Sequence, residues 1–229
     1  MLLAAVAAMA VGVAGCGSSS SSDNGVAARS PTEIVAAAKA AADAASSVHV
    51  AGSIVSGGVP LTLDLSLAAG KGGQGRISQN GLSFEVIQLN GTAYISGSPA
   101  FYSHFAGPAA AQLLQGKWLK ASATTGSLAS LAPLTELRKL VDSAVATRGG
   151  TLTKGAKTTI EGQPAVAVTE TAQKGVLYVA TTGQPYPIEI AKSGDGGGKI
   201  VFGKWNQPVT LAAPKNSVDI SELQARAHG

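Results

Sequence analysis

Alternating hydrophobic and polar residues give the strongest structural signal in this chain. Over residues 59–67, leucine occupies every second position from Leu61 on, and threonine, aspartate and serine stand between the leucines. This period of two is typical of a β-strand with one buried and one solvated face. The pattern continues on both sides of this stretch. Asn80-Gly81 and Asn90-Gly91 predict tight hairpin turns within it, because Asn-Gly is a favoured dipeptide of two-residue hairpin loops.

A period close to 3.6 predicts helices in other parts of the chain. Residues 32–47 follow Ser30, and Glu33 completes a capping-box pattern with that serine. The apolar residues of this segment are mostly alanines, so the helix can pack closely on a sheet. A short polar helix is predicted over 219–229. A further helical pattern begins near Pro133 and includes Leu134, Leu137, Leu140 and Val141.

The order of these patterns indicates the fold class. The second half of the chain returns to short strand-like runs bounded by glycine and proline. Strands, then helices, then strands predict an α+β domain. The connections between strands are too short for helical crossovers, so the sheet should be antiparallel, with helices covering its apolar face. We expect one domain over 31–229, which is an ordinary size for a single hydrophobic core.

The first residues predict a secretory signal. Residues 1–15 form an uncharged apolar run, shorter than the roughly 20 residues that span a bilayer. Such a run is typical of the apolar part of a signal peptide. It ends at Cys16, the only cysteine of the chain, so no disulfide within the chain is available. Residues 16–30 are rich in serine and predict a flexible tether.

The residues before the cysteine suggest its chemistry. Val13-Ala14-Gly15-Cys16 resembles the lipobox of bacterial lipoproteins, in which a branched aliphatic residue and two small residues precede the cysteine. This resemblance implies that the thiol is diacylglycerylated, that the chain is cut before Cys16, and that the new N-terminus can be acylated, for example with palmitate. Several acyl chains anchor a protein stably to the extracytoplasmic face of the cell membrane, where one would not. The alternative is a chance cysteine at the end of a signal peptide.

Composition and charge limit the classes of function. The chain has 17 Lys+Arg and 13 Asp+Glu, and 45% of its residues are hydrophobic, which is a globular composition. The net charge of +4 is spread along the chain without a block of basic residues, so no nucleic-acid partner is indicated. Gly70–Gly75 spells G-x-G-x-x-G. A strand pattern follows it instead of the helix that a dinucleotide-binding motif requires, so we expect a hairpin loop.

Candidate catalytic and metal-binding residues are sparse. His49, His104 and His228 do not pair with a second ligand at metal-binding spacing, and the chain carries neither a Walker loop nor a nucleophile elbow. Asp64 and Glu85 lie at positions expected to face solvent. We therefore expect no catalysis, no metal and no cofactor. A hydrolase with a Ser/His/Asp arrangement assembled by the fold is the weakest of three alternatives for the function, and the other two are given below.

Several segments follow the order seen in the LppX/LprG family of actinobacterial lipoproteins. Besides the lipobox they are "SVHVAGSI", "NGTAYI", "TIEGQPAVAVTETA", "VLYVATTGQPYPIEI" and "IVFGKWNQPVTLAAP". The resemblance covers most of the chain after the tether and includes no catalytic signature. It implies a curved antiparallel half-barrel sheet with helices on its concave face, as in lipoprotein carriers of the LolA type. It also implies an apolar cavity for the acyl chains of envelope lipids or lipoglycans.

These observations predict a membrane-anchored protein that binds an acylated lipid or lipoglycan and carries or presents it. The alternative is an envelope interaction or structural protein of the same fold, with its interior filled by its own side chains. A void of several hundred Å³ would favour the carrier. The side chains expected to meet such a cavity come from the alternating strands, the helical pattern and the aromatic positions: Leu61, Leu63, Leu65, Phe84, Val86, Tyr94, Trp118, Leu137, Val141 and Tyr178.

Overall fold

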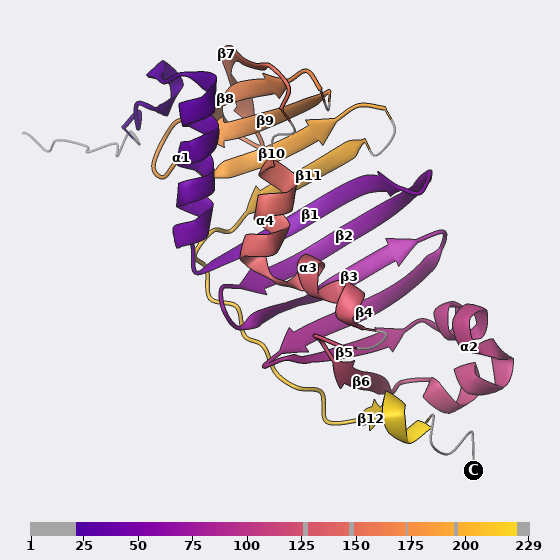
Figure 1. The fold of residues 1–229 in the computed structure, drawn as a ribbon. Coiled ribbons are helices and arrows are strands. Elements are labelled where there is room, and N and C mark those ends of the chain that lie inside the picture. Colours follow the sequence, from indigo (N-terminus) through magenta and orange to yellow (C-terminus); the bar gives the residue numbers. More distant parts are fainter. Residues whose placement is uncertain (1–21, 126–127, 147–148, 173, 195–196, 224–229) are drawn as a thin grey trace, which may run out of the picture.

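A computed structural model describes residues 22–125, 128–146, 149–172, 174–194 and 197–223. These residues form one curved, open sheet of 12 strands in the order β12-β6-β5-β4-β3-β2-β1-β11-β10-β9-β8-β7 (Figure 1). Every neighbouring pair is antiparallel except β12 and β6, which run parallel. The expected α+β class is confirmed, and the sheet is antiparallel as expected except for this one pair.

The first half of the sheet is a series of hairpins joined by short turns. Asn80 and Gly81 have φ angles of 53° and 74°, and Asn90 and Gly91 have 51° and 76°. Positive φ at both central residues is what a type I′ turn requires, so both predicted hairpins are confirmed. The strands of this half are β1 (Ser47–Ser56), β2 (Val59–Ala68), β3 (Gly72–Gln79), β4 (Leu82–Leu89) and β5 (Thr92–Gly97).

The second half of the sheet attaches to the first strand. β11 pairs with β1 along six residues, from His49↔Gly203 to Ile54↔Gly198. The strands of this half are β7 (Leu152–Ile160), β8 (Gln163–Glu170), β9 (Gly175–Ala180), β10 (Pro187–Lys192) and β11 (Gly198–Gly203). The opposite edge is completed by β6 (Trp118–Ser122) and β12 (Ser217–Asp219).

The leucine alternation gives the sheet two different faces. Leu63 and Leu65 are buried, whereas Asp64 between them exposes 70% of its side chain. The helices α1 (Pro31–Ala44), α3 (Ala132–Thr135) and α4 (Leu137–Val145) lie on the side of the buried leucines (Figure 1). We call this side the helical face, and the side that carries Asp64 the polar face.

The predicted alanine-rich helix is confirmed as α1. The Ser30 hydroxyl accepts a hydrogen bond from the Glu33 N–H, and the Glu33 carboxylate accepts one from the Ser30 N–H at 2.9 Å. This capping box satisfies backbone groups at the helix start. The helix ends at Ala44, earlier than predicted, because Ala45 is already extended and β1 begins at Ser47.

The second predicted helical pattern is divided in two. Glu136 has extended backbone angles, φ −108° and ψ 117°, and it separates α3 from α4. Thr135 at the end of α3 is fully buried, and its hydroxyl donates a hydrogen bond to the side chain of Gln88 in β4. The sheet meets α3 closely at Gly73, where a Cβ atom would lie 2.9 Å from the Thr135 carbonyl oxygen. This contact fixes α3 on the helical face.

Some elements differ from the expectations. Gly70 lies in a turn as expected, but the rest of the predicted glycine loop, 72–75, belongs to β3. The predicted C-terminal helix begins later, because β12 occupies its start and only 220–223 are helical among the described residues. Three helices are additional to the predicted ones: η1 (Val26–Ala28), α2 (Pro99–Leu114) and η2 (Ala129–Leu131).

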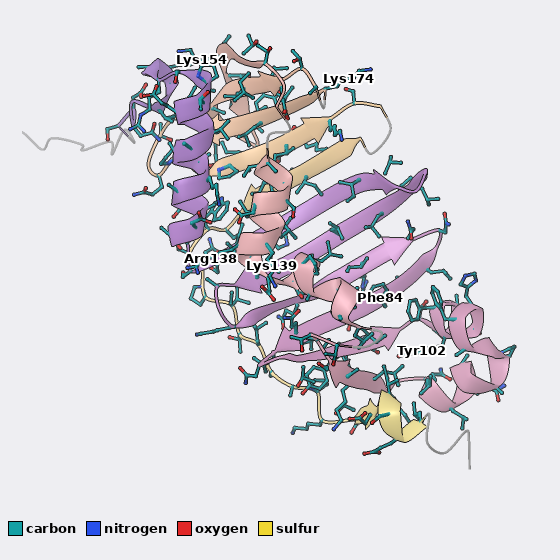
Figure 2. All side chains as sticks on the ribbon, in the orientation of Figure 1. Phe84, Tyr102, Arg138, Lys139, Lys154 and Lys174 are labelled. Atoms are coloured by element: carbon teal, nitrogen blue, oxygen red, sulfur yellow. The ribbon has the colours of Figure 1, made fainter. Side chains whose placement is uncertain are left out.

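Part of the predicted tether is attached to the sheet. Asp23 forms a bridge with Thr182, just after β9, and Val26 is buried. Lys154 of β7 donates to the carbonyl oxygens of Ala27 and Arg29 at 3.1 and 3.0 Å (Figure 2). The predicted signal peptide, 1–15, and Cys16 lie outside the described residues. No helix in the described ranges is long and apolar enough to cross a membrane.

Candidate functional site

An apolar cavity of about 380 Å³ lies between the helical face and the helices α3 and α4. We call it the central cavity. Its volume falls in the usual range of small-molecule sites, roughly 300–1,000 Å³. Its walls come from β1, β2, β10 and β11 on one side and from the helices on the other: Val50, Ile54, Leu63, Pro133, Leu134, Leu140, Ser143, Ala144, Ile190, Lys192, Gly198 and Ile200.

A second cavity of about 220 Å³ lies beside the first, towards α2. We call it the aromatic cavity. The ring of Phe101 lies 5.1 Å from that of Phe84 and 4.8 Å from that of Phe105, measured between centroids. Leu134 of α3 lines both cavities, so they adjoin at that side chain. The full lining is Leu61, Ile77, Gln79, Leu82, Phe84, Phe101, Phe105, Leu131 and Leu134.

A third, small cavity of about 80 Å³ lies on the other side of the central cavity, next to α1. It shares Ala144, Ile190 and Lys192 with the central cavity. The three voids therefore form a row beneath the helices, running from the strands that contact α1 to those that contact α2.

The lining of the central cavity offers few polar groups. Among the described residues that line it, only Lys192, at the end of β10, is charged, and only Ser143 of α4 carries a hydroxyl. The cavity is partly open to solvent, and its mostly apolar walls are suited to a hydrocarbon group. Binding in such a site depends on removing apolar ligand surface from water. The arrangement is suited to an alkyl chain.

The structure brings some of the predicted site residues to these cavities. Leu63 lines the central cavity, and Leu61 and Phe84 line the aromatic cavity. Other predicted residues belong to the hydrophobic core on the same face of the sheet and line none of these cavities. At most 2% of their surface is exposed: Leu65, Val86, Leu137 and Val141.

The remaining predicted residues lie on the polar face. Tyr94 stands between Ala93 and Ile95, which are buried on the helical face, so its side chain points the other way. Trp118 likewise precedes the buried Leu119. Tyr178 packs against a separate small cluster around Ile188. The structure does not bring these three aromatic side chains together with the cavity leucines.

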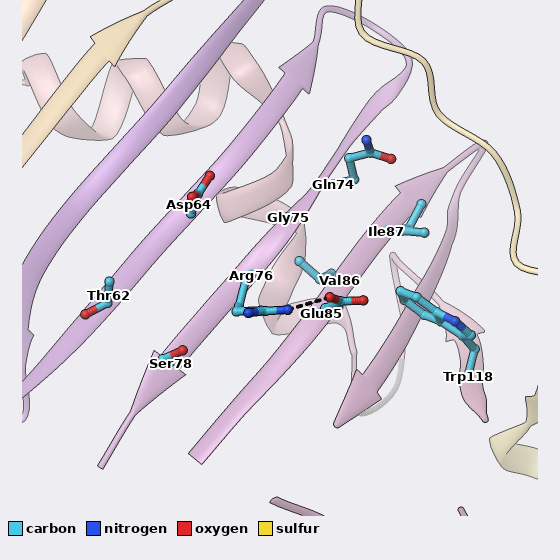
Figure 3. A pocket seen from close by; sticks show the side chains of 10 residues that line it. All are labelled: Thr62, Asp64, Gln74, Gly75, Arg76, Ser78, Glu85, Val86, Ile87 and Trp118. Atoms are coloured by element: carbon cyan, nitrogen blue, oxygen red, sulfur yellow. Dashed lines mark hydrogen bonds and ion pairs between the residues drawn. The ribbon is translucent and has the colours of Figure 1, made fainter. Parts of the chain in front are cut away.

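Trp118 borders an open, polar groove of about 600 Å³ on that face (Figure 3). Arg76 of β3 donates a hydrogen bond to Glu85 of β4 at 2.8 Å within it (Figure 3). Asp64 and Glu85 were expected to face solvent, and both are exposed there. Cross-strand pairs of opposite charge contribute to sheet stability, which accounts for Arg76 and Glu85 without a ligand.

The cavity lining also contains residues that sequence reasoning did not select. Ile190 and Ile200 reach the central cavity because β10 and β11 continue the sheet beside β1. Their strand pattern is visible in the sequence, but their position next to Leu63 depends on the pairing of distant strands. Leu134 and Leu140 belong to the predicted helical pattern, and that pattern could have indicated them.

The third alternative, a Ser/His/Asp site, finds no geometric support in the described part of the chain. The His49 ring forms its hydrogen bond with Asp64, between Nε2 and Oδ1 at 2.9 Å, and no serine hydroxyl bonds to it there. Among the same residues, no three His, Cys, Asp or Glu side chains gather where they could hold a metal ion.

Comparison with known proteins supports the fold. No family model and no curated protein matches the sequence. The structure is similar to that of LprF from Mycobacterium bovis, with a TM-score of 0.57 and 16% identity over 80% of this chain and 96% of that one. It is also similar to the lipoprotein LppX from Mycobacterium tuberculosis, with a TM-score of 0.50 and 18% identity over 80% of this chain and 100% of that one. The expected resemblance to the LppX/LprG family is confirmed at the level of the fold.

Proposed function

We propose that this chain is an extracytoplasmic, membrane-anchored lipoprotein that binds an acylated lipid and carries or presents it. The central cavity is the observation that carries the proposal. An interior filled by its own side chains would leave few voids larger than a water molecule. The cavity of about 380 Å³, adjoining another of about 220 Å³, therefore favours a carrier over a filled core.

The driving force for binding is the burial of methylene groups. Each methylene moved out of water contributes about 0.8 kcal/mol, so about ten of them contribute on the order of 8 kcal/mol before the costs of association. Lys192 is the one charged group among the described residues that line the central cavity. A ligand with an anionic or strongly polar head would place that head near Lys192 and its alkyl chain along the leucines.

The fold adds support to the class of ligand. The protein shares its fold with LppX, which is described as a lipoprotein. The resemblance to the LppX/LprG family implies a half-barrel whose concave side is the helical face. It also implies that the bound molecule is an acylated envelope lipid or lipoglycan. The function needs no catalytic residue.

The anchor is proposed from the lipobox-like sequence at Cys16. Replacing Cys16→Ser should release the protein from the membrane fraction or leave the apolar leader uncleaved, because serine offers no thiol to acylate. Fractionation followed by mass measurement of the N-terminus checks this. A serine variant that is still cut before residue 16 and still sediments with membranes would show that the anchor is wrong.

The cavity is tested by closing it. In a form that begins at Ser22 and keeps every described helix and strand, Leu63→Trp should lower the affinity for a fluorescent fatty acid at least roughly tenfold, because the indole fills the central cavity. Thr62→Trp is the matched control, since Thr62 is the neighbouring residue on the polar face. It should bind the probe as the unchanged protein does.

A second variant tests the same cavity in case Leu63→Trp does not fold. Ser143→Trp fills the same cavity from an exposed position on α4, where added bulk is easily tolerated. Cooperative unfolding in urea checks that each variant is folded. The proposal fails if the unchanged protein ignores the probe, or if Leu63→Trp and Ser143→Trp both fold and bind it normally.

A further inference from the structure

The helix α2 has an unusual surface for a helix at the outside of a protein. Its residues, Pro99–Leu114, include no Asp, Glu, Lys or Arg. Tyr102, Ala111 and Leu114 are buried beneath it. Its exposed residues include the polar Ser103, His104 and Gln112, but also two large apolar side chains, Phe105 and Leu113, with 67% and 70% of their surface exposed. Large exposed apolar side chains on an uncharged helix are typical of a surface that contacts a membrane or another molecule.

The exposed side chains of Phe105 and Leu113, which we call the patch, adjoin the aromatic cavity at Phe105. Phe101 and Phe105 reach the cavity from α2, and Phe84 of β4 meets them from the sheet. Figure 2 shows Phe84 and Tyr102 where α2 meets the sheet. Phe105 thus belongs both to the cavity wall and to the exposed surface. An alkyl chain leaving the aromatic cavity past Phe105 would emerge at the patch.

The backbone of α2 presents both exposed side chains. Gly107 has φ 84° and ψ 166°, a conformation that glycine adopts easily, and Pro108 begins the following segment. The helix is therefore kinked into two short pieces, with Phe105 on the first and Leu113 on the second. An exposed lysine, Lys117, follows the second piece.

The charges around α2 fit the surface of a bilayer. No acidic residue occurs in the sequence between Glu85 and Glu136, and Lys117 is exposed beside α2, whereas Lys120 is paired with Asp219 of β12 at 4.0 Å. Membrane surfaces that contain anionic lipids attract nearby lysines and repel carboxylates. Apolar side chains flanked by basic ones are typical of segments that lie at the boundary between headgroups and acyl chains.

We propose that α2 is a membrane-docking element, which inserts Phe105 and Leu113 into the acyl boundary of a lipid bilayer. Lipid then passes between that bilayer and the aromatic cavity without crossing water. This inference rests on the proposed function, because the docking element would deliver lipid to the cavity described there.

The docking element lies far from the N-terminal segment. In the strand order, β5 beneath α2 is seven positions from β9, where the N-terminal segment attaches, or roughly 34 Å at about 4.8 Å per strand. The docking element lies at the end opposite the tether (Figure 1).

Insertion can be measured by fluorescence quenching. The full chain is reconstituted with vesicles of phosphatidylcholine and phosphatidylglycerol whose acyl chains are brominated. Tryptophan placed by Leu113→Trp should be quenched, because it reaches the acyl chains. Thr62→Trp on the polar face is the control, and its added fluorescence should be unaffected. Both variants keep Trp118 and Trp205, so the signals are compared after subtraction of the unchanged protein.

A charged residue at position 113 should impair membrane docking without changing the binding of a fatty acid in the cavity. Leu113 lines none of the three cavities described, so Leu113→Glu should leave the affinity for a fluorescent fatty acid supplied in solution unchanged. The same variant should extract a fluorescent phospholipid from vesicles roughly tenfold more slowly, because one leucine is lost from the inserted surface.

Three results would overturn the inference. One is that the tryptophan at position 113 is quenched no more than the control. Another is that Leu113→Glu extracts lipid at the normal rate. The third is shielding of position 113 by a protein partner, seen as protection from aqueous quenchers without quenching by brominated lipid. Quenching does not depend on probe uptake, so a failure of the proposed function would be recognised separately.

Discussion

Two helical units cover the same face of one sheet with different results. Beside α1 the interior is nearly solid, since Ile34, Ala38 and Ala42 are completely buried and the neighbouring void is about 80 Å³. Beneath α3 and α4 the voids are about 380 and 220 Å³. An alanine-rich composition therefore does not exclude a cavity. The alanines of α1 close one end of the sheet, and larger residues line the space left in the middle.

The reason lies in the size of the side chains at the contact. The distance between packed elements depends on the side chains between them. In α1, two alanines follow Ile34 at a spacing of four, so the helix approaches the sheet closely. In α4 the same spacing carries Leu137, Val141 and Val145, which are buried. These branched side chains hold α4 further from the strands.

The largest expected effect on stability concerns the closely packed region beneath α1. Ile34→Ala should lower the free energy of unfolding by about 2–5 kcal/mol, because it leaves a void where neighbouring atoms cannot collapse. Urea denaturation followed by circular dichroism measures this. A loss below about 1 kcal/mol would mean that α1 is not packed as tightly as its burial indicates.

A smaller effect on stability is expected beneath α3 and α4, where the larger cavities lie. Leu134 is only half-buried and already borders two cavities, so Leu134→Ala should cost about 1 kcal/mol in the free energy of unfolding. The same denaturation experiment applies. If Leu134→Ala cost as much as Ile34→Ala, the contrast between the two regions would be wrong.

The smallest effect concerns the link between the two units. Lys39 of α1 donates hydrogen bonds to Asp142 of α4 and to Asp43. The hydrogen bond to Asp142, with that to Asp43, raises the pKa of Lys39. A raised lysine pKa stabilises the fold below the ordinary value near 10.4, and this contribution is lost as the pH rises through the folded-state pKa.

Asp142→Asn should therefore cost at most about 1 kcal/mol near neutral pH, since both groups are largely exposed. The difference between the variant and the unchanged protein should shrink above about pH 10.4, where the amine loses its charge. Urea midpoints measured at both pH values check the sign. A penalty that grows with pH would contradict this account of the pair.

Local patterns were sufficient for much of the fold. The strand with alternating leucines and the Asn-Gly turns were predicted because period and turn chemistry depend only on neighbouring residues. The start of α1 was predicted for the same reason, since its capping box joins Ser30 to Glu33. The helix α2 was not predicted, because Gly107 and Pro108 interrupt its periodicity and large apolar side chains also occupy its exposed side.

The two faces of each strand and the hairpin turns follow from local sequence alone, and so does the prediction of an anchor, because each depends on residues close together in the chain. The tertiary structure decided which side of the sheet each aromatic residue occupies, as the positions of Tyr94 and Trp118 on the polar face show. The pairing of β11 with β1 also depends on the tertiary structure, and it places Ile200 and Leu63 on either side of Gly52 in the wall of one cavity. A cavity is a distance between elements, set by all the side chains packed between them, and no local pattern contains that distance.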